Sequence, residues 1–213
     1  MHKTALIWDL DGTLWDACDT VAAAWNGYCS AHGLDRSFSA DDCRRCCGKT
    51  LAEIAALLFP DEAVEARETK TAELFASENP PLALHGGMLF PGALEILEDL
   101  HSRFFMAVVS NCGAGYVEAF FEGNRTAKFF DDYENPARTG LDKGDNIRLV
   151  MARNSIERAV YIGDTDGDFR AARKAGVPFV HAAYGFGEVP EAEFRAERFS
   201  DLPELIRRIL GLS

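Results

Sequence analysis

The chain has 213 residues, of which 47% are apolar and 26% are charged. Its 34 acidic and 22 basic side chains leave a formal net charge of -12. This balance is typical of a folded globular protein and excludes a disordered chain, and the length allows one domain or one domain with a smaller insert. The acidic surplus also argues against nucleic acid as a partner, because phosphate backbones attract basic surfaces.

Two further classes of protein are disfavoured by local patterns. The first apolar run, residues 5–8, is too short for a signal peptide or a membrane span, so we expect a cytoplasmic protein without a membrane partner. In that compartment the six cysteines are expected to be free thiols. Cys43, Cys46 and Cys47 stand close together, but no second pair follows at zinc spacing, so we interpret them as small residues on a helix.

Short apolar runs alternate with helical patterns along most of the chain. Five runs predict buried strands: 5–8, 104–109, 129–133, 159–162 and 178–183. Four amphipathic stretches predict helices: 93–101, 143–154, 169–175 and 202–210. Strands that alternate with helices predict an α/β fold with a doubly wound, Rossmann-like parallel sheet.

The stretch after the first strand differs, because it contains no convincing strand. Four helices are predicted within it, at 19–32, 41–47, 51–58 and 62–75. We expect Pro80 and Pro81 to end the last helix, and Gly86 with Gly87 to give a flexible return to the core. The prediction is an all-helical cap domain of residues 15–84, inserted in a core made of residues 1–14 and 85–213.

Acidic residues follow the first strand. Asp9 and Asp11 are two positions apart, so in an extended chain they point to the same side, and Gly12 then permits a sharp turn. In open α/β sheets, ligands bind beyond the carboxyl ends of the strands. The pair is therefore a candidate catalytic site, although a turn rich in Asp and Gly is the structural alternative.

Two later strands also end in polar residues. Ser110 and Asn111 would donate hydrogen bonds to an oxyanion or, alternatively, cap a helix. Asp164, Asp166 and Asp168 place three acids in five residues. Like charges about 4 Å apart repel by about 4 kcal/mol at an effective dielectric near 20, so such a cluster calls for a cation. Magnesium prefers hard oxygen ligands of this kind, whereas the alternative is an acidic helix N-terminus.

Taken together, these features resemble the phosphatase branch of the haloacid dehalogenase superfamily, whose members carry a helical cap. The segment Asp9-Leu10-Asp11-Gly12-Thr13-Leu14 matches the first family motif and Ser110-Asn111 the second. Lys143, for which a surface position is the alternative, matches the third motif, and Gly163-Asp164-Thr165-x-x-Asp168 the fourth. The segment Tyr184-Gly185-Phe186-Gly187 resembles phosphoglycolate phosphatase-like members. One departure is Gly144, which stands where a proline usually follows the lysine.

The resemblance implies a magnesium-dependent phosphatase that hydrolyses a small phosphorylated metabolite, such as phosphoglycolate or a sugar phosphate, through an aspartyl-phosphate. It makes Asp9 the nucleophile and Asp11 the general acid and base. The phosphorylated substrate would be bound by Ser110, Lys143, Asn111 and Thr13. The Mg²⁺ would be held by Asp9, the Asp11 backbone carbonyl and Asp164, with Asp168 in support.

The charge balance independently favours a cation at such a site. Four carboxylates would face a phosphate dianion, so a divalent ion, the Lys143 ammonium and a protonated Asp11 are needed to neutralise them. In the cap, Arg44, Arg45 and Lys49 are candidates to bind an anionic tail of the substrate, although solvated surface charges are their commoner fate.

Several alternatives share parts of this pattern. A β-phosphoglucomutase-type phosphomutase has the same motifs but needs a second phosphate-binding group in the cap. A dehalogenase is disfavoured because Asp11 is present. A receiver-like phospho-acceptor switch is disfavoured because Asp9 ends the first strand and a cap insert follows it, and a catalytically inactive binding module because every catalytic position is occupied. The sequence leaves open whether the protein is a monomer or a homodimer.

Overall fold

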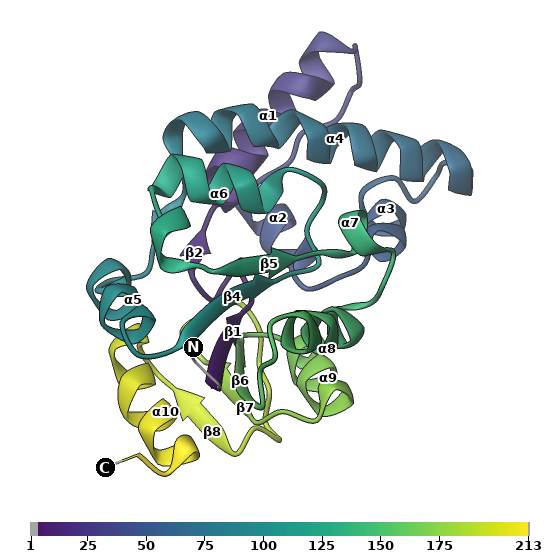
Figure 1. Cartoon of the computed structure of the whole chain (residues 1–213). Coiled ribbons are helices and arrows are strands. Elements are labelled where there is room, and N and C mark those ends of the chain that lie inside the picture. Colours follow the sequence, from purple (N-terminus) through teal and green to yellow (C-terminus); the bar gives the residue numbers. More distant parts are fainter. Residues whose placement is uncertain (1–3, 213) are drawn as a thin grey trace.

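The computed structural model describes residues 4–212, and a six-stranded parallel sheet lies at its centre (Figure 1). The strand order is β5-β4-β1-β6-β7-β8. The strands are β1 Thr4–Trp8, β4 Phe105–Val109, β5 Asp132–Glu134, β6 Arg158–Gly163, β7 Phe179–Ala182 and β8 Phe194–Ala196. Because β1 pairs in parallel with both β4 and β6, the carboxyl ends of these three strands lie side by side.

Helices cover both faces of this sheet, with α5 and α10 on one side and α8 and α9 on the other (Figure 1). The helices of the core are α5 Ala93–His101, α6 Tyr116–Asn124, α7 Pro136–Thr139, α8 Lys143–Arg153, α9 Asp166–Ala175 and α10 Leu202–Leu210. Along β1, Leu6 and Trp8 pack into one apolar layer, whereas Ala5 and Ile7 pack into the other. A strand buried on both faces explains why its sequence is continuously apolar. The doubly wound α/β fold is confirmed.

Helices α1 to α4 form the cap over the carboxyl ends of the central strands (Figure 1). The elements are β2 Trp15–Asp16, α1 Cys18–Ala31, α2 Ala40–Cys46, α3 Leu51–Leu58, α4 Val64–His85 and β3 Met88–Leu89. The short strands β2 and β3 pair antiparallel, with Trp15 opposite Leu89. The chain therefore leaves the core and returns to it along one two-stranded ribbon.

The end of the last cap helix differs from the expectation. Pro80 and Pro81 lie inside α4, which continues to His85 and ends at Gly86 with a φ of 69°. Each proline removes one helical hydrogen bond. Packing outweighs this loss, because Glu78 before the prolines and Leu82 after them are both buried. The prediction that Pro80 and Pro81 end this helix is therefore wrong.

Other differences concern short or irregular elements. Helices α6 and α7, strand β8 and the β2–β3 ribbon were not predicted, and a 3₁₀ turn, Ala127–Phe129, leads into β5 where a strand was predicted at 129–133. The six cysteines are free thiols, as expected, with Cys43 and Cys46 buried on α2. Across residues 4–212, no helix has both the length and the apolar content needed to cross a membrane.

Candidate active site

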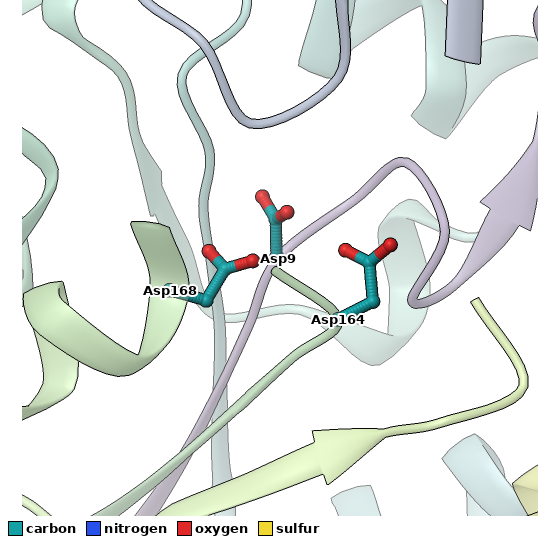
Figure 2. A group of neighbouring side chains, drawn as sticks. All are labelled: Asp9, Asp164 and Asp168. Atoms are coloured by element: carbon teal, nitrogen blue, oxygen red, sulfur yellow. The ribbon is translucent and has the colours of Figure 1, made fainter. Parts of the chain in front are cut away.

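Three buried carboxylates converge at the carboxyl ends of β1 and β6 (Figure 2). Asp9 follows β1, Asp164 follows β6, and Asp168 lies in the first turn of α9. One carboxylate oxygen from each of the three lies within 4.8 Å of the others. The parallel pairing of β1 with β6 brings them together, because strands that run in one direction end at one edge.

Lys143 joins two of these carboxylates. It opens α8, and its Nζ donates to Asp9 Oδ1 at 2.9 Å and to Asp168 Oδ1 at 2.6 Å. The side chain is only 5% exposed, so it is not a surface lysine. Burial disfavours its charged form, but the Asp168 and Asp9 carboxylates outweigh this and raise the pKa of Lys143 above its ordinary value.

Both carboxylate oxygens of Asp168 already accept hydrogen bonds. Its Oδ2 accepts from the Thr165 hydroxyl at 2.6 Å and from the Thr165 amide at 3.0 Å, which completes a capping box at the start of α9. Its Oδ1 accepts from Lys143 and from the Tyr161 hydroxyl at 3.2 Å. These contacts suit a residue that fixes the position of the Lys143 ammonium.

Asp164 is the carboxylate best suited to bind a cation. Its Oδ2 accepts from the backbone amide of Phe186 at 2.8 Å, but its buried Oδ1 has no hydrogen-bond partner within the described part of the chain. Burial and the Asp168 and Asp9 charges raise the pKa of Asp164 well above its usual range. An unpartnered carboxylate oxygen next to Asp9 fits the hard oxygen ligands that Mg²⁺ prefers.

The two acids of the first motif have different surroundings. Burial and the Asp168 charge raise the pKa of Asp9 to about 6, although Lys143 and the Ser110 hydroxyl lower it. Asp11 is half-buried, and its Oδ1 accepts from the Tyr116 hydroxyl at 2.8 Å. Burial raises the pKa of Asp11 to about 7, against the lowering effect of Tyr116. Asp11 is therefore able to give and take a proton near neutral pH.

Two glycines allow the close approach of segments around these acids. Gly12 has a φ of 76°, and a Cβ there would lie 2.2 Å from Asp164 Oδ2. At Gly144 a Cβ would lie 2.9 Å from Cδ of Lys174 and 3.1 Å from the Ala171 carbonyl oxygen. The glycine that departs from the family pattern thus lets α8 pack closely on α9, and Lys143 still reaches the site.

A small cavity of about 70 Å³ separates the acids from the cap. Five of the predicted site residues line it, namely Asp9, Asp11, Ser110, Asn111 and Lys49. The cap touches the core beside this cavity, where the side-chain amide of Asn111 donates to the Gly48 carbonyl at 3.3 Å. A cap that covers the nucleophile in this way excludes water from it.

The structure does not bring the other two predicted substrate ligands into this cavity. Thr13 is fully buried, its carbonyl accepts from the Tyr184 hydroxyl at 2.9 Å, and it is absent from the residues that line the cavity. Arg45 lines a separate outer groove, is exposed and pairs with Asp42. Arg44, which lines the same groove, pairs with Asp16 and Asp41.

Three residues around the site carried no signal in the sequence. Tyr116 lies on α6, which the sequence analysis missed, and Tyr161 is one more aromatic residue within a buried strand. Glu78 lies on α4, lines the cavity and is only 4% exposed. A single acid in a polar helix has no distinctive pattern, so its position follows only from how α4 packs.

Comparison with known proteins shows the family to which the chain belongs. The model of the haloacid dehalogenase-like hydrolases matches residues 6–182. A phosphoglycolate phosphatase from Vibrio parahaemolyticus is 26% identical, over 94% of this chain and 95% of the relative. Another, from Synechococcus elongatus, is 28% identical, over 86% of this chain and 85% of the relative.

Solved structures share the fold. A haloacid dehalogenase-like hydrolase from Streptococcus pneumoniae superposes with a TM-score of 0.80 at 21% identity, covering 95% of this chain and 98% of the other. CbbY from Rhodobacter sphaeroides, solved with xylulose-1,5-bisphosphate, gives a TM-score of 0.72 at 21% identity, covering 95% of this chain and 96% of the other. Since the family model covers most of the sequence, the chain belongs to the haloacid dehalogenase-like hydrolases.

Proposed function

We propose that the protein is a magnesium-dependent phosphatase that hydrolyses a small phosphate monoester through an aspartyl-phosphate on Asp9. The observation that carries this proposal is the buried bridge from Lys143 to Asp9 and Asp168, beside the unpartnered oxygen of Asp164. An ammonium in contact with the nucleophile can bind the oxygens of the transferring phosphoryl group.

The reaction would proceed in two balanced steps. An Asp9 carboxylate oxygen attacks phosphorus, the ester bond breaks, and the leaving alkoxide takes the Asp11 proton. Asp11, now a carboxylate, removes a proton from water, which attacks phosphorus and releases inorganic phosphate and the Asp9 carboxylate. Burial and the pKa of about 7 for Asp11 suit both halves of this proton transfer.

Asp9, Asp164 and the Asp11 carbonyl would hold the magnesium ion. When bound, it supplies positive charge that offsets the buried carboxylates and the incoming phosphate. Asp168, expected to support the metal, would do so through Lys143, because both of its oxygens are already hydrogen-bonded. Ser110 and Lys143 would bind the phosphoryl oxygens.

Hydrolysis is favoured over phosphoryl transfer between two positions of a sugar. A phosphomutase needs a second phosphate-binding group in the cap. In the closed arrangement Arg44 and Arg45 line the outer groove and pair with acidic residues, and the cavity holds Lys49 alone among described basic side chains. The substrates to test are sugar phosphates and phosphoglycolate, which appears in the names of the relatives.

The test is phosphate release from an aryl phosphate and a panel of small phosphate monoesters, with and without Mg²⁺. We expect turnover that depends on the metal and falls by about 10³-fold or more in Asp9→Asn, which removes the nucleophile. Asp19→Asn, an exposed aspartate on the cap helix α1, is the matched control and should retain activity. Full activity in Asp9→Asn, or after thorough chelation, would contradict the proposal.

A further inference from the structure

The roof of the catalytic cavity is chemically unlike its floor. The floor carries Asp9, Asp11 and Ser110 from the core. The cap supplies apolar side chains, thiols, one carboxyl group and one ammonium group: Val21, Trp25, Ile54, Phe75, Cys18, Cys43, Cys46, Cys47, Glu78 and Lys49. The leaving group of a substrate bound at Asp9 must lie against this roof, because the phosphoryl group occupies the floor.

Glu78 has one oxygen engaged and one available. The Trp25 indole donates to its Oε2 at 2.8 Å, in a buried contact between α1 and α4. Within residues 4–212, Oε1 has no hydrogen-bond partner. Burial raises the pKa of Glu78 well above its ordinary value, and the Asp11 charge adds to this, while Trp25 opposes it.

Positive charge is scarce in this cavity. Lys49 is the one basic side chain that lines it within the described part of the chain, and Lys49 is exposed. A carboxylate on the leaving group would therefore be buried against a carboxyl group and apolar side chains. Burying a charge without an opposite partner is strongly unfavourable, whereas a hydroxyl needs only one hydrogen bond.

The size of the cavity adds a second restriction. Its volume of about 70 Å³ restricts the leaving group under the roof to a few carbon atoms. A hydroxyl on such a group would hydrogen-bond to Oε1 in either protonation state of Glu78, since a carboxyl can donate and a carboxylate can accept.

We propose that Glu78 is a specificity-determining residue, and that the site takes phosphate monoesters of small, uncharged, hydroxyl-bearing alcohols in preference to those of carboxylates. This inference rests on the proposed phosphatase activity and deepens it by naming the leaving group. It separates this chain from the substrate that the names of its curated relatives suggest.

Two substrates test the inference directly. 2-Hydroxyethyl phosphate and 2-phosphoglycolate differ only in a hydroxymethyl group against a carboxylate. We expect kcat/KM of the wild-type protein to favour 2-hydroxyethyl phosphate by about tenfold or more. A preference for 2-phosphoglycolate would overturn the inference. If that preference then disappeared in Lys49→Ala, Lys49 would be the residue that binds the substrate carboxylate.

Glu78→Gln links the preference to the residue. The amide oxygen of glutamine can still accept from Trp25, and its NH₂ group offers donors to a carboxylate. We expect the ratio of the two kcat/KM values to shift toward 2-phosphoglycolate by about tenfold or more. The matched control is Glu73→Gln, an exposed acid on the same helix, which should leave the ratio unchanged.

The outcomes distinguish this inference from the proposed function. If the wild-type protein releases phosphate from neither substrate nor from the aryl phosphate, the proposed function fails. If turnover depends on Asp9 but the ratio is the same in Glu78→Gln and wild type, only the role of Glu78 fails. The wild-type comparison needs no variant, so it decides the preference even if Glu78→Gln does not fold.

Discussion

The edge of the core sheet and the roof of the cap enclose one cavity, yet they are built differently. At the sheet edge, Asp9, Asp168 and Lys143 form a dense buried network in which the ammonium touches both carboxylates. The roof consists of aromatic, aliphatic and thiol side chains with the single carboxyl of Glu78 and the exposed Lys49. The edge is suited to phosphoryl transfer and the roof to selecting the leaving group, so substitutions in the two regions should affect different quantities.

After the nucleophile Asp9, the largest effect at the sheet edge is expected from Asp164→Asn. Loss of the charge next to Asp9 should abolish Mg²⁺ binding measured by isothermal titration calorimetry and lower kcat/KM by about 10²-fold or more. Asp166→Asn is the control, because Asp166 is exposed two residues away and pairs with Arg170. Unchanged Mg²⁺ affinity in Asp164→Asn would remove this residue from the metal site.

A smaller loss of activity is expected from Asp168→Asn, which weakens the hold on Lys143. Removing one partner of a buried ion pair costs about 3–5 kcal/mol of stability. The melting temperature should therefore fall, and kcat should decrease more than KM rises, since Lys143 acts on the transferring phosphoryl group. If Mg²⁺ affinity falls as far as in Asp164→Asn, Asp168 is itself a metal ligand.

The packing beneath the sheet edge is tested by Gly144→Ala. The added Cβ would press on Lys174 and the Ala171 carbonyl, so we expect a loss of about 1–3 kcal/mol in the free energy of unfolding. Gly27→Ala, on the exposed side of α1, meets nothing within 4 Å and should gain up to about 1 kcal/mol. Denaturant unfolding measures both, and equal effects would contradict the close approach of α8 and α9.

The smallest effect is expected in the roof, on the pH dependence of stability. Folding raises the pKa of Glu78, so this residue contributes to the stability of the folded protein. The contribution is fully present below the pKa that Glu78 has in the unfolded chain, and it is lost as the pH rises through the pKa that it has in the folded protein. Glu78→Gln does not lose stability in this way, because glutamine does not titrate. Its melting temperature relative to wild type should therefore be higher at pH 8 than at pH 4.5. A difference that does not change with pH would mean that Glu78 titrates normally.

Prediction from the sequence succeeded where local pattern and chemistry coincide. The strand ending at Trp8 is recognisable because it is buried on both faces, and the acids after it are conspicuous because they follow an apolar run. Prediction failed at α4, where two prolines are held inside a helix by buried neighbours. The sequence could not show which oxygens of Asp164 and Asp168 are already hydrogen-bonded, because those contacts depend on the folded chain.

The sequence by itself determined the fold class, the order of the acids along the chain and the chemistry they can perform, because these depend on periodicity and residue type. Only the tertiary structure decided that Lys143 bridges Asp9 and Asp168 and that Glu78 faces the same cavity. It also showed that Asp9, Asp164, Asp168 and Glu78 are buried, so part of the acidic surplus lies inside the protein. Those facts depend on contacts between residues far apart in the chain, and on the burial that turns ordinary carboxyl groups into a reactive site.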